Sequence, residues 1–251
     1  MKRLDFLICG AQKAGTSALD KYMREHPSIQ MPKSKEIHYF DREGINWNEQ
    51  QETEYELYHQ SFNWSEERTR GEATPVYMYW KRSWERIMEY KKAIKIIILL
   101  RNPITRAYSH WNMEEKRGRE NLSFIEAIKC EKERLGFEGE QNINHRKWSY
   151  VDRGFYTKQI EYMYKYINKE NVLILKQEEL LRGRNKALCK IYDHLSVEQI
   201  THNREITEHQ SAYREPINRE AKIYLIDRYR DEIGRLERLL NWDCSSWLSI
   251  E

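Results

Sequence analysis

The feature that most constrains the fold is an apolar strand running directly into a glycine-bracketed turn and then a helix, at residues 4–17 (LDFLICGAQKAGTS). The apolar run is typical of a strand buried on both faces of a parallel sheet. Gly10 and Gly15 bracket the turn, and Thr16 and Ser17 stand where they can cap the following helix. Backbone N–H groups, hydroxyls and the positive helix end then meet at one point, which favours an anion such as phosphate.

The position of the lysine in this turn is unusual. A Walker A loop has its lysine after the second glycine, whereas Lys13 lies inside the loop and Thr16 follows Gly15 directly. From the loop side, an ammonium group would meet the bridging oxygen of a phosphate, where charge builds when a group leaves the terminal phosphate. An ordinary strand–turn–helix with a solvated lysine explains the same residues, because short motif matches carry a real false-positive risk.

Composition excludes several classes of protein. The net charge of +3 is small against 43 basic and 40 acidic residues. The surface is therefore of mixed charge, without the excess of basic residues that is typical of nucleic-acid binding. The four cysteines lie far apart without a C-x-x-C pair, so neither a metal site nor a disulfide framework is predicted. No secretory signal is recognisable, and no stretch approaches the roughly 18 apolar residues of a membrane span. We therefore expect a cytoplasmic protein.

Strand and helix patterns alternate along the chain. Apolar runs predict strands at residues 4–9, 93–100 (AIKIIILL) and 171–175 (NVLIL), with a strand end and turn at 71–75. Helical patterns occupy residues 77–90, 104–116, 124–135, 156–167, 187–195 and 217–240. This alternation predicts one α/β domain over residues 1–251, a P-loop-like three-layer fold with a central parallel sheet flanked by helices.

The expected crevice of this sheet collects the residues that carry chemistry. Ligands of parallel sheets bind outside the carboxyl ends of the strands, so Lys13 and Arg101 are expected to face one crevice. Arg101 is followed eight residues later by Ser109, and Glu36 and His38 form an acid–imidazole pair. Two separate phosphate sites suggest a nucleotide that is phosphorylated at two places.

With these motifs in order, the chain resembles the sulfotransferases that use 3′-phosphoadenosine 5′-phosphosulfate (PAPS), particularly the heparan-type glycan enzymes and their bacterial relatives. Residues 6–19 resemble the 5′-phosphosulfate loop, 96–111 (IIILLRNPITRAYSHW) the 3′-phosphate segment, and 35–41 (KEIHYFD) the segment that supplies a catalytic glutamate. The resemblance implies catalytic roles for Glu36, Lys13 and His38. It also implies donor binding by Lys13, Ala14, Gly15, Thr16, Ser17, Arg101, Ser109, Arg153 and Tyr156.

The reaction implied by the resemblance is an in-line displacement through a loose transition state, which resembles phosphoryl transfer. Lys13 neutralises charge on the departing 5′-phosphate. Glu36 takes the proton from an acceptor hydroxyl or amine, and His38 orients Glu36 or shares the proton. PAPS is released as adenosine 3′,5′-bisphosphate, and lysine and backbone donors are expected to suffice without a metal.

Two features depart from the family pattern. Eukaryotic heparan enzymes often carry a lysine in the turn where this chain has Ala73, and Lys35 is a candidate substitute. The paired cysteines near the family's C-terminus are not recognisable, because Cys189 and Cys244 do not flank a short basic loop. The family's cover over the adenine and 3′-phosphate would fall near residues 211–214. The charged region at 118–150 is a candidate excursion over the active site.

Two other functions remain open at this stage. A P-loop kinase using ATP predicts a lysine after Gly15 and an acidic magnesium ligand at a strand end, whereas this chain has Thr16 and Arg101 there. A non-catalytic nucleotide- or glycan-binding protein of the same fold is the second alternative, and Glu36 and Lys13 argue against it. The acceptor, a glycan, lipid or small molecule, and the oligomeric state are left undetermined.

Overall fold

The computed structural model describes residues 2–47, 52–136, 141–204, 206 and 215–250, and the chain forms two compact units. The first unit comprises Met1–Leu100 and Tyr162–Gln210, and the second comprises Arg101–Glu161 and Ser211–Glu251.

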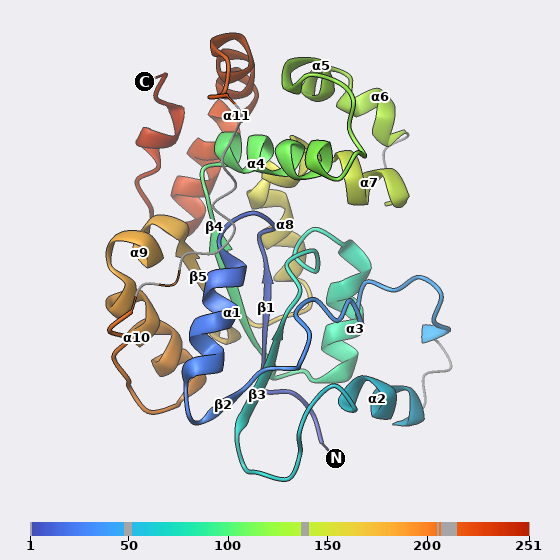
Figure 1. Ribbon diagram of the computed structural model, residues 1–251, viewed down its shortest axis with the longest axis vertical. Helices are drawn as coiled ribbons and strands as arrows, with labels where there is room; N and C mark the ends of the chain where they lie inside the picture. Colours follow the sequence, from blue (N-terminus) through green and yellow to red (C-terminus); the bar gives the residue numbers. More distant parts are fainter. Residues whose placement is uncertain (1, 48–51, 137–140, 205, 207–214, 251) are drawn as a thin grey trace. The chain divides into compact units, whose positions relative to one another are not determined.

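A five-stranded parallel sheet forms the centre of the first unit (Figure 1). Its strands, in the spatial order β2-β3-β1-β4-β5, are β1 (Phe6–Gly10), β2 (Ile29–Gln30), β3 (Thr69–Ala73), β4 (Lys95–Leu100) and β5 (Val172–Lys176). Every described pairing between these strands is parallel. The predicted central parallel sheet is thereby confirmed.

Strand β1 lies in the middle of this sheet, and all five of its residues are buried. It pairs with β3 on one edge and β4 on the other, so Phe6 stands beside Gly71 and Lys95. Burial on both faces explains why the strand reads as an unbroken apolar run instead of an alternating one.

Helices of the first unit connect and cover the strands. They are α1 (Thr16–Glu25), α2 (Glu52–His59), α3 (Lys81–Tyr90), α9 (Gln177–Arg182) and α10 (Arg184–Leu195), with the 3-10 turn η3 (Lys169–Asn171). The connection through α1 leads from β1 toward β2, and the one through α3 leads from β3 across to β4. Because parallel crossovers are right-handed, these opposite directions put α1 and α3 on opposite faces of the sheet.

The second unit is helical in its described residues. Its elements are α4 (Pro103–Lys116), α5 (Phe124–Lys129), α6 (Glu131–Leu135), α7 (Ile143–Trp148), η2 (Asp152–Gly154), most of α8 (Tyr156–Met163), α11 (Arg219–Leu240) and η4 (Ser245–Leu248). Pro103 stands in the first turn of α4, after an N-cap at Asn102 whose side chain accepts from the backbone N–H of Ile104 at 2.9 Å. Proline and asparagine are favoured at these two positions.

Several predicted boundaries were wrong. The two-residue strand β2 and the helices α7 and α9 were not predicted. The predicted helix at 124–135 is divided at Cys130 into α5 and α6. Helix α3 begins at Lys81 instead of residue 77, because residues 74–80 form a turn whose N–H groups bond partly to β1.

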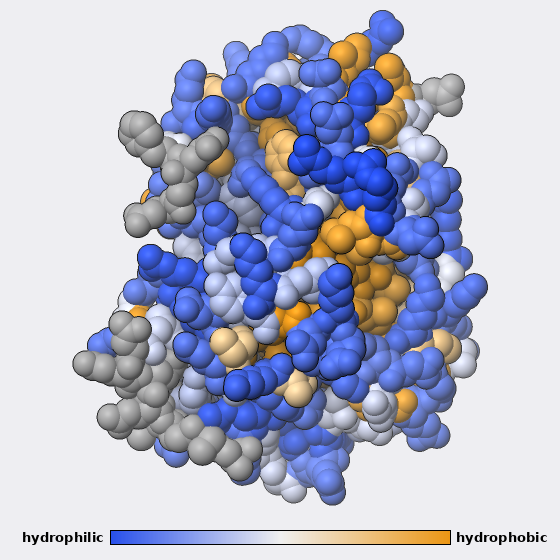
Figure 2. All heavy atoms as spheres, turned by 180° about the vertical axis from the view of Figure 1, so that it is seen from behind, coloured by the Kyte–Doolittle hydropathy of each residue, from blue (hydrophilic) through white to orange (hydrophobic). Residues whose placement is uncertain are grey.

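Hydrophilic side chains cover most of the face in Figure 2, and apolar side chains appear there in limited areas. This agrees with a chain of which 33% is charged. Among the described residues, no helix is long and apolar enough to cross a membrane.

The contact between Phe6 and Gly71 predicts a stability effect. A Cβ added at Gly71 would lie 2.4 Å from the buried Phe6 ring, so Gly71→Ala should lower the free energy of unfolding by about 1–3 kcal/mol through overpacking. Gly44→Ala is the control, since no atom lies within 4 Å of a Cβ there, and it should change stability by less than about 0.5 kcal/mol. Urea unfolding measures both, and equal stability of the two variants would contradict this packing.

Candidate active site

The glycine-bracketed turn lies between β1 and α1, at the carboxyl edge of the sheet. Connections leave β1 toward β2 and leave β4 toward β5, so the strand order reverses between the neighbours β1 and β4. Such a reversal is the usual ligand-binding position of an open parallel sheet. The turn therefore lies at the switch point of the first unit.

Backbone geometry in this turn depends on two left-handed residues. Lys13 has a φ of 70° and Gly15, the N-cap of α1, has a φ of 94°. A Cβ at Gly15 would also lie 3.3 Å from the side-chain nitrogen of Gln177. The N–H groups of the first two residues of α1 have no carbonyl acceptor within the helix, and a glycine N-cap has no side chain to offer them. The predicted capping of this helix by Thr16 and Ser17 was wrong, because Gly15 is the N-cap and no side chain caps the helix. A helix start without a side-chain cap is suited to an external anion, and anion binding here stays a prediction.

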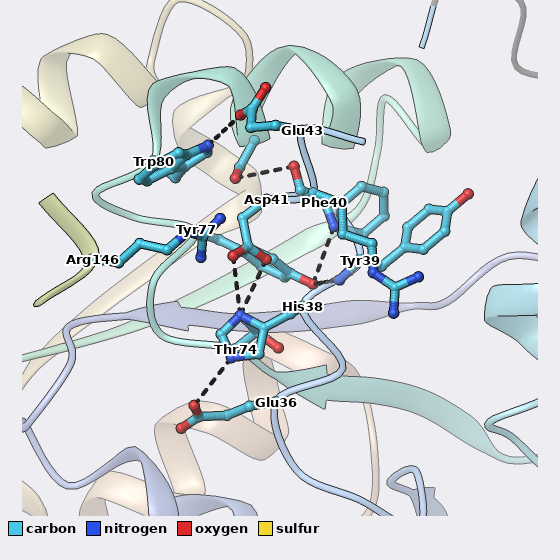
Figure 3. A network of polar contacts seen from close by, with 12 residues as sticks. Glu36, His38, Tyr39, Phe40, Asp41, Glu43, Thr74, Tyr77, Trp80 and Arg146 are labelled. Carbon is cyan, nitrogen blue, oxygen red and sulfur yellow. Dashed lines mark hydrogen bonds and ion pairs between the residues drawn. The ribbon is translucent and has the colours of Figure 1, made fainter. Parts of the chain in front are cut away.

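Glu36, His38 and Asp41 lie together on an irregular segment (Figure 3), and Lys35 precedes them in the chain. The Lys35 Nζ is 2.6 Å from Glu36 Oε1, and the His38 Nε2 is 3.5 Å from Glu36 Oε2. The other ring nitrogen, Nδ1, lies 3.0 Å from Asp41 Oδ2. Asp41 is 1% exposed, whereas Glu36 is 39% and His38 43% exposed. The structure thus forms a carboxylate–imidazole–carboxylate row whose Glu36 end is open to solvent.

Charged neighbours in this row keep both Glu36 and His38 ionised. The hydrogen bond with Asp41, supported by Glu36, raises the pKa of His38 from 6.5 to about 9. Burial alone would raise the pKa of Glu36, but His38 and Lys35 outweigh it and lower that pKa to about 2. At neutral pH, Glu36 is therefore a carboxylate and His38 an imidazolium that donates from both ring nitrogens.

Asp41 is the functional residue that sequence reasoning missed in this row. The available signal was its position three residues after His38, within the same motif. Lys35, named as a candidate substitute for a lysine absent at Ala73, has its ammonium on the Glu36 carboxylate.

Arg101, Ser109 and Tyr156 belong to the second unit. Arg101 Nε donates to Thr105 Oγ1 at 2.9 Å, and the buried Tyr156 hydroxyl donates to the Arg101 carbonyl at 2.9 Å. Ser109 lies one helical turn beyond Thr105, on the same face of α4, because residues four apart are neighbours on a helix. The structure thus brings the Arg101 backbone together with Tyr156, whereas Ser109 lies one turn along α4 from the Thr105 side chain that Arg101 contacts. Thr105 is a further polar residue that the sequence did not single out.

Arg153 is 3% exposed, and its guanidinium is directed into its own unit. Its Nε donates to Ser149 Oγ at 2.6 Å and its Nη2 to the His145 carbonyl at 2.8 Å, beside the end of α7. These contacts stabilise a helix terminus, and nucleotide contact by Arg153 stays a prediction. So does a common crevice for Lys13 and Arg101. Residues 211–214, named for the adenine cover, lie outside the described residues.

Within the described part of the chain, no group of three or more His, Cys, Asp or Glu side chains is arranged to hold a metal ion.

Comparison with known proteins identifies the family. The sulfotransferase domain family model matches residues 3–224, so the chain belongs to the sulfotransferase family. Human heparan sulfate glucosamine 3-O-sulfotransferase 3B1 is 25% identical over 77% of this chain and 46% of its own length.

Two solved structures are also similar. A sulfotransferase from Alicyclobacillus acidocaldarius matches with a TM-score of 0.79 and 29% identity over 99% of this chain and 100% of the other. A mouse sulfotransferase, SULT7A1 complexed with PAP, has the same fold at 17% identity, with a TM-score of 0.51 over 80% of this chain and 60% of the other. The resemblance predicted from the motifs is thereby confirmed at the level of family and fold. The chain spans 65% and 46% of the lengths of the first curated relatives it matches.

The charge state of His38 gives a testable prediction. Nuclear magnetic resonance titration of its ring protons should give a pKa of about 9. Asp41→Asn removes the principal hydrogen-bonded carboxylate and should move that pKa toward 6.5. A pKa raised on folding stabilises the fold fully below about 6.5, and this contribution is lost as the pH rises through about 9. His38→Gln identifies the resonance, and ordinary titration near 6.5 in the unaltered protein would contradict the row.

Proposed function

We propose that this protein transfers a sulfuryl group from PAPS to an acceptor hydroxyl or amine, with Glu36 as the general base. The observation that carries this function is the open carboxylate of Glu36, held ionised between Lys35 and His38 in a member of the sulfotransferase family. A base must be deprotonated and within reach of the acceptor. Glu36 is ionised at neutral pH and 39% exposed.

In the proposed reaction, the acceptor oxygen or nitrogen attacks the sulfur of PAPS in line with the bridging oxygen. The bond from sulfur to that oxygen breaks, and its electron pair leaves with the 5′-phosphate as adenosine 3′,5′-bisphosphate. The acceptor proton passes to Glu36, and the His38 imidazolium, fixed by Asp41, holds the carboxylate in position. Lys13 and the start of α1 stabilise charge that develops on the departing phosphate.

Donor binding is divided between two segments in this proposal. Residues 13–17 hold the 5′-phosphosulfate, as the left-handed turn and the helix start at Thr16 favour. Arg101 and Ser109 hold the 3′-phosphate, with Tyr156 fixing the backbone that carries Arg101. The PAP complex of a mouse protein with this fold supports a 3′-phosphorylated nucleotide. Family membership and the absence of a lysine directly after Gly15 weigh against an ATP kinase.

The acceptor proposed here is a glycan, in line with the heparan sulfate relative. Lipid and small-molecule hydroxyls stay alternatives, and incubation with labelled donor and a panel of acceptors separates them. Action in the cytoplasm remains a proposal from the sequence alone.

Nucleotide selectivity tests the donor. Adenosine 3′,5′-bisphosphate should bind at least about tenfold tighter than ATP in titration calorimetry, since charge-assisted hydrogen bonds to the 3′-phosphate are worth about 1.5–3 kcal/mol. Arg101→Ala should weaken that binding by about 10- to 100-fold and leave adenosine 5′-phosphosulfate binding nearly unchanged. Arg117→Ala, which removes an exposed arginine paired with Glu114, is the control. Equal binding of the two nucleotides by the unaltered protein would contradict the donor assignment.

The base is tested by Glu36→Gln. Turnover should fall by about 10²–10⁴-fold because glutamine cannot accept the proton, while nucleotide affinity stays the same. Glu66→Gln is the matched control, since Glu66 is an exposed carboxylate paired with Arg68. Labelled sulfuryl transfer measures turnover, and near-normal activity of Glu36→Gln would eliminate Glu36 as the base.

A further inference from the structure

The segment that carries Glu36 and His38 has an unfavourable backbone. Residues 36–39 form neither helix nor strand, yet Glu36 has a φ of 62° and His38 a φ of 56°. Side chains other than glycine rarely adopt this left-handed region. Each such residue costs about 1–3 kcal/mol and persists only where its surroundings hold it. Glu36 and His38 are therefore the two residues of this segment whose backbone must be held by surrounding contacts.

A fully buried carboxylate, Glu72 at the end of β3, lies beneath this segment. Its Oε1 accepts from the Tyr58 hydroxyl at 2.7 Å and the Tyr77 hydroxyl at 2.9 Å, and its Oε2 accepts from the Thr74 hydroxyl at 2.8 Å. The backbone N–H of Ile37 is a fourth donor. A buried carboxylate with this many donors fixes the position of each of them.

The Tyr77 hydroxyl connects this carboxylate to the segment. While it donates to Glu72, it accepts from the backbone N–H of Tyr39 at 2.9 Å and of Phe40 at 3.4 Å (Figure 3). The Glu36 N–H donates to the Ala73 carbonyl at 3.1 Å. Backbone N–H groups on both sides of His38 are therefore tied to the end of β3 and the turn after it.

Carbonyl groups of the same stretch are held separately. Arg86 of α3 donates from Nη1 to the carbonyls of Phe40 at 2.8 Å and Arg42 at 2.9 Å, and from Nη2 to Glu43 at 3.1 Å. Arg86 therefore fixes the stretch after Phe40. In the stretch before it, the Ala73 carbonyl holds the first N–H, and the side chains of Glu72 and Tyr77 hold the N–H groups on either side of His38.

We propose that Glu72 and Tyr77 are positioning residues for sulfuryl transfer: the buried carboxylate orients the Tyr77 hydroxyl, which holds the backbone that presents Glu36 and His38. Neither residue touches the reacting atoms. Because Glu36 is the base only in the proposed reaction, this role rests on the proposed function. A misplacement of about 1 Å in a reacting group can cost about 100-fold in rate.

Tyr58 supplies a matched control for Tyr77. Both hydroxyls are buried and donate to the same oxygen of Glu72, but the described contacts of the Tyr58 hydroxyl include no backbone N–H of the segment. Tyr77→Phe and Tyr58→Phe each remove one donor from the same carboxylate. A merely structural role predicts equal effects of the two variants, whereas a positioning role predicts an effect of Tyr77→Phe alone.

The experiment compares the His38 titration and the turnover of the two variants. In Tyr77→Phe, the pKa of His38 should fall from about 9 toward 6.5 as its contact with Asp41 loosens, and kcat should drop by about 10- to 100-fold with nucleotide affinity unchanged. Tyr58→Phe should keep both values while losing similar thermal stability. An unmoved His38 titration in Tyr77→Phe, or equal kcat losses in the two variants, would overturn the proposal.

Amide hydrogen exchange in the unaltered protein tests the proposal even if a variant does not fold. The N–H groups of Ile37, Tyr39 and Phe40 should exchange as slowly as those of β3, and exchange as fast as in exposed loops would overturn the positioning role. Neither this measurement nor the His38 titration needs a substrate. If the unaltered protein transfers no sulfuryl group, the proposed function fails, while these two readouts still test whether Tyr77 holds the segment.

Discussion

The hydrogen bonds of the central strand β1 are the constraint on which two parts of the first unit's candidate site depend: the glycine-bracketed turn and the segment with Glu36. Its carbonyls at Ile8 and Cys9 accept from the backbone N–H groups of Thr74 at 3.1 Å and Met78 at 2.9 Å. The turn fixed in this way carries Tyr77, which in turn holds the segment with Glu36. The same strand continues into the glycine-bracketed turn, where the Ala11 N–H donates to the Leu99 carbonyl of β4 at 2.7 Å. One buried strand therefore sets the position of both the glycine-bracketed turn and the segment that carries Glu36, the proposed base.

Much of the fold could be predicted from the sequence because its central strands are buried on both faces. Continuous apolar runs identify β1 and β4 without any knowledge of their neighbours. The start of α3 could not be predicted in the same way, because residues 74–80 bond to β1, which lies far away in the sequence. Strand β2 has only two residues, too few for a periodic pattern.

The same difference between local motifs and distant contacts applies to the candidate site. Lys13, Gly15, Glu36 and His38 could be named because each belongs to a short local motif. Asp41 belongs to the same motif as His38 and could have been named from its spacing. Tyr77 could not, since its role depends on contacts that only the folded chain makes. The left-handed backbone at Glu36 was also hidden, because its usual signal is a glycine and the segment contains none.

The low pKa of Glu36 constrains how the proposed reaction proceeds. A carboxylate with a pKa of about 2, paired with Lys35 and His38, is a poor base toward a free hydroxyl. In a loose transition state, however, the acceptor carries little bond order to sulfur at first, and its proton becomes strongly acidic only as that bond forms. A weak base is then sufficient late in the reaction, and the two neighbouring cations keep the carboxylate ionised until it is needed. In the proposed reaction, positioning of Glu36 consequently contributes more to catalysis than its basicity, in line with the hydrogen bonds that hold the backbone around it.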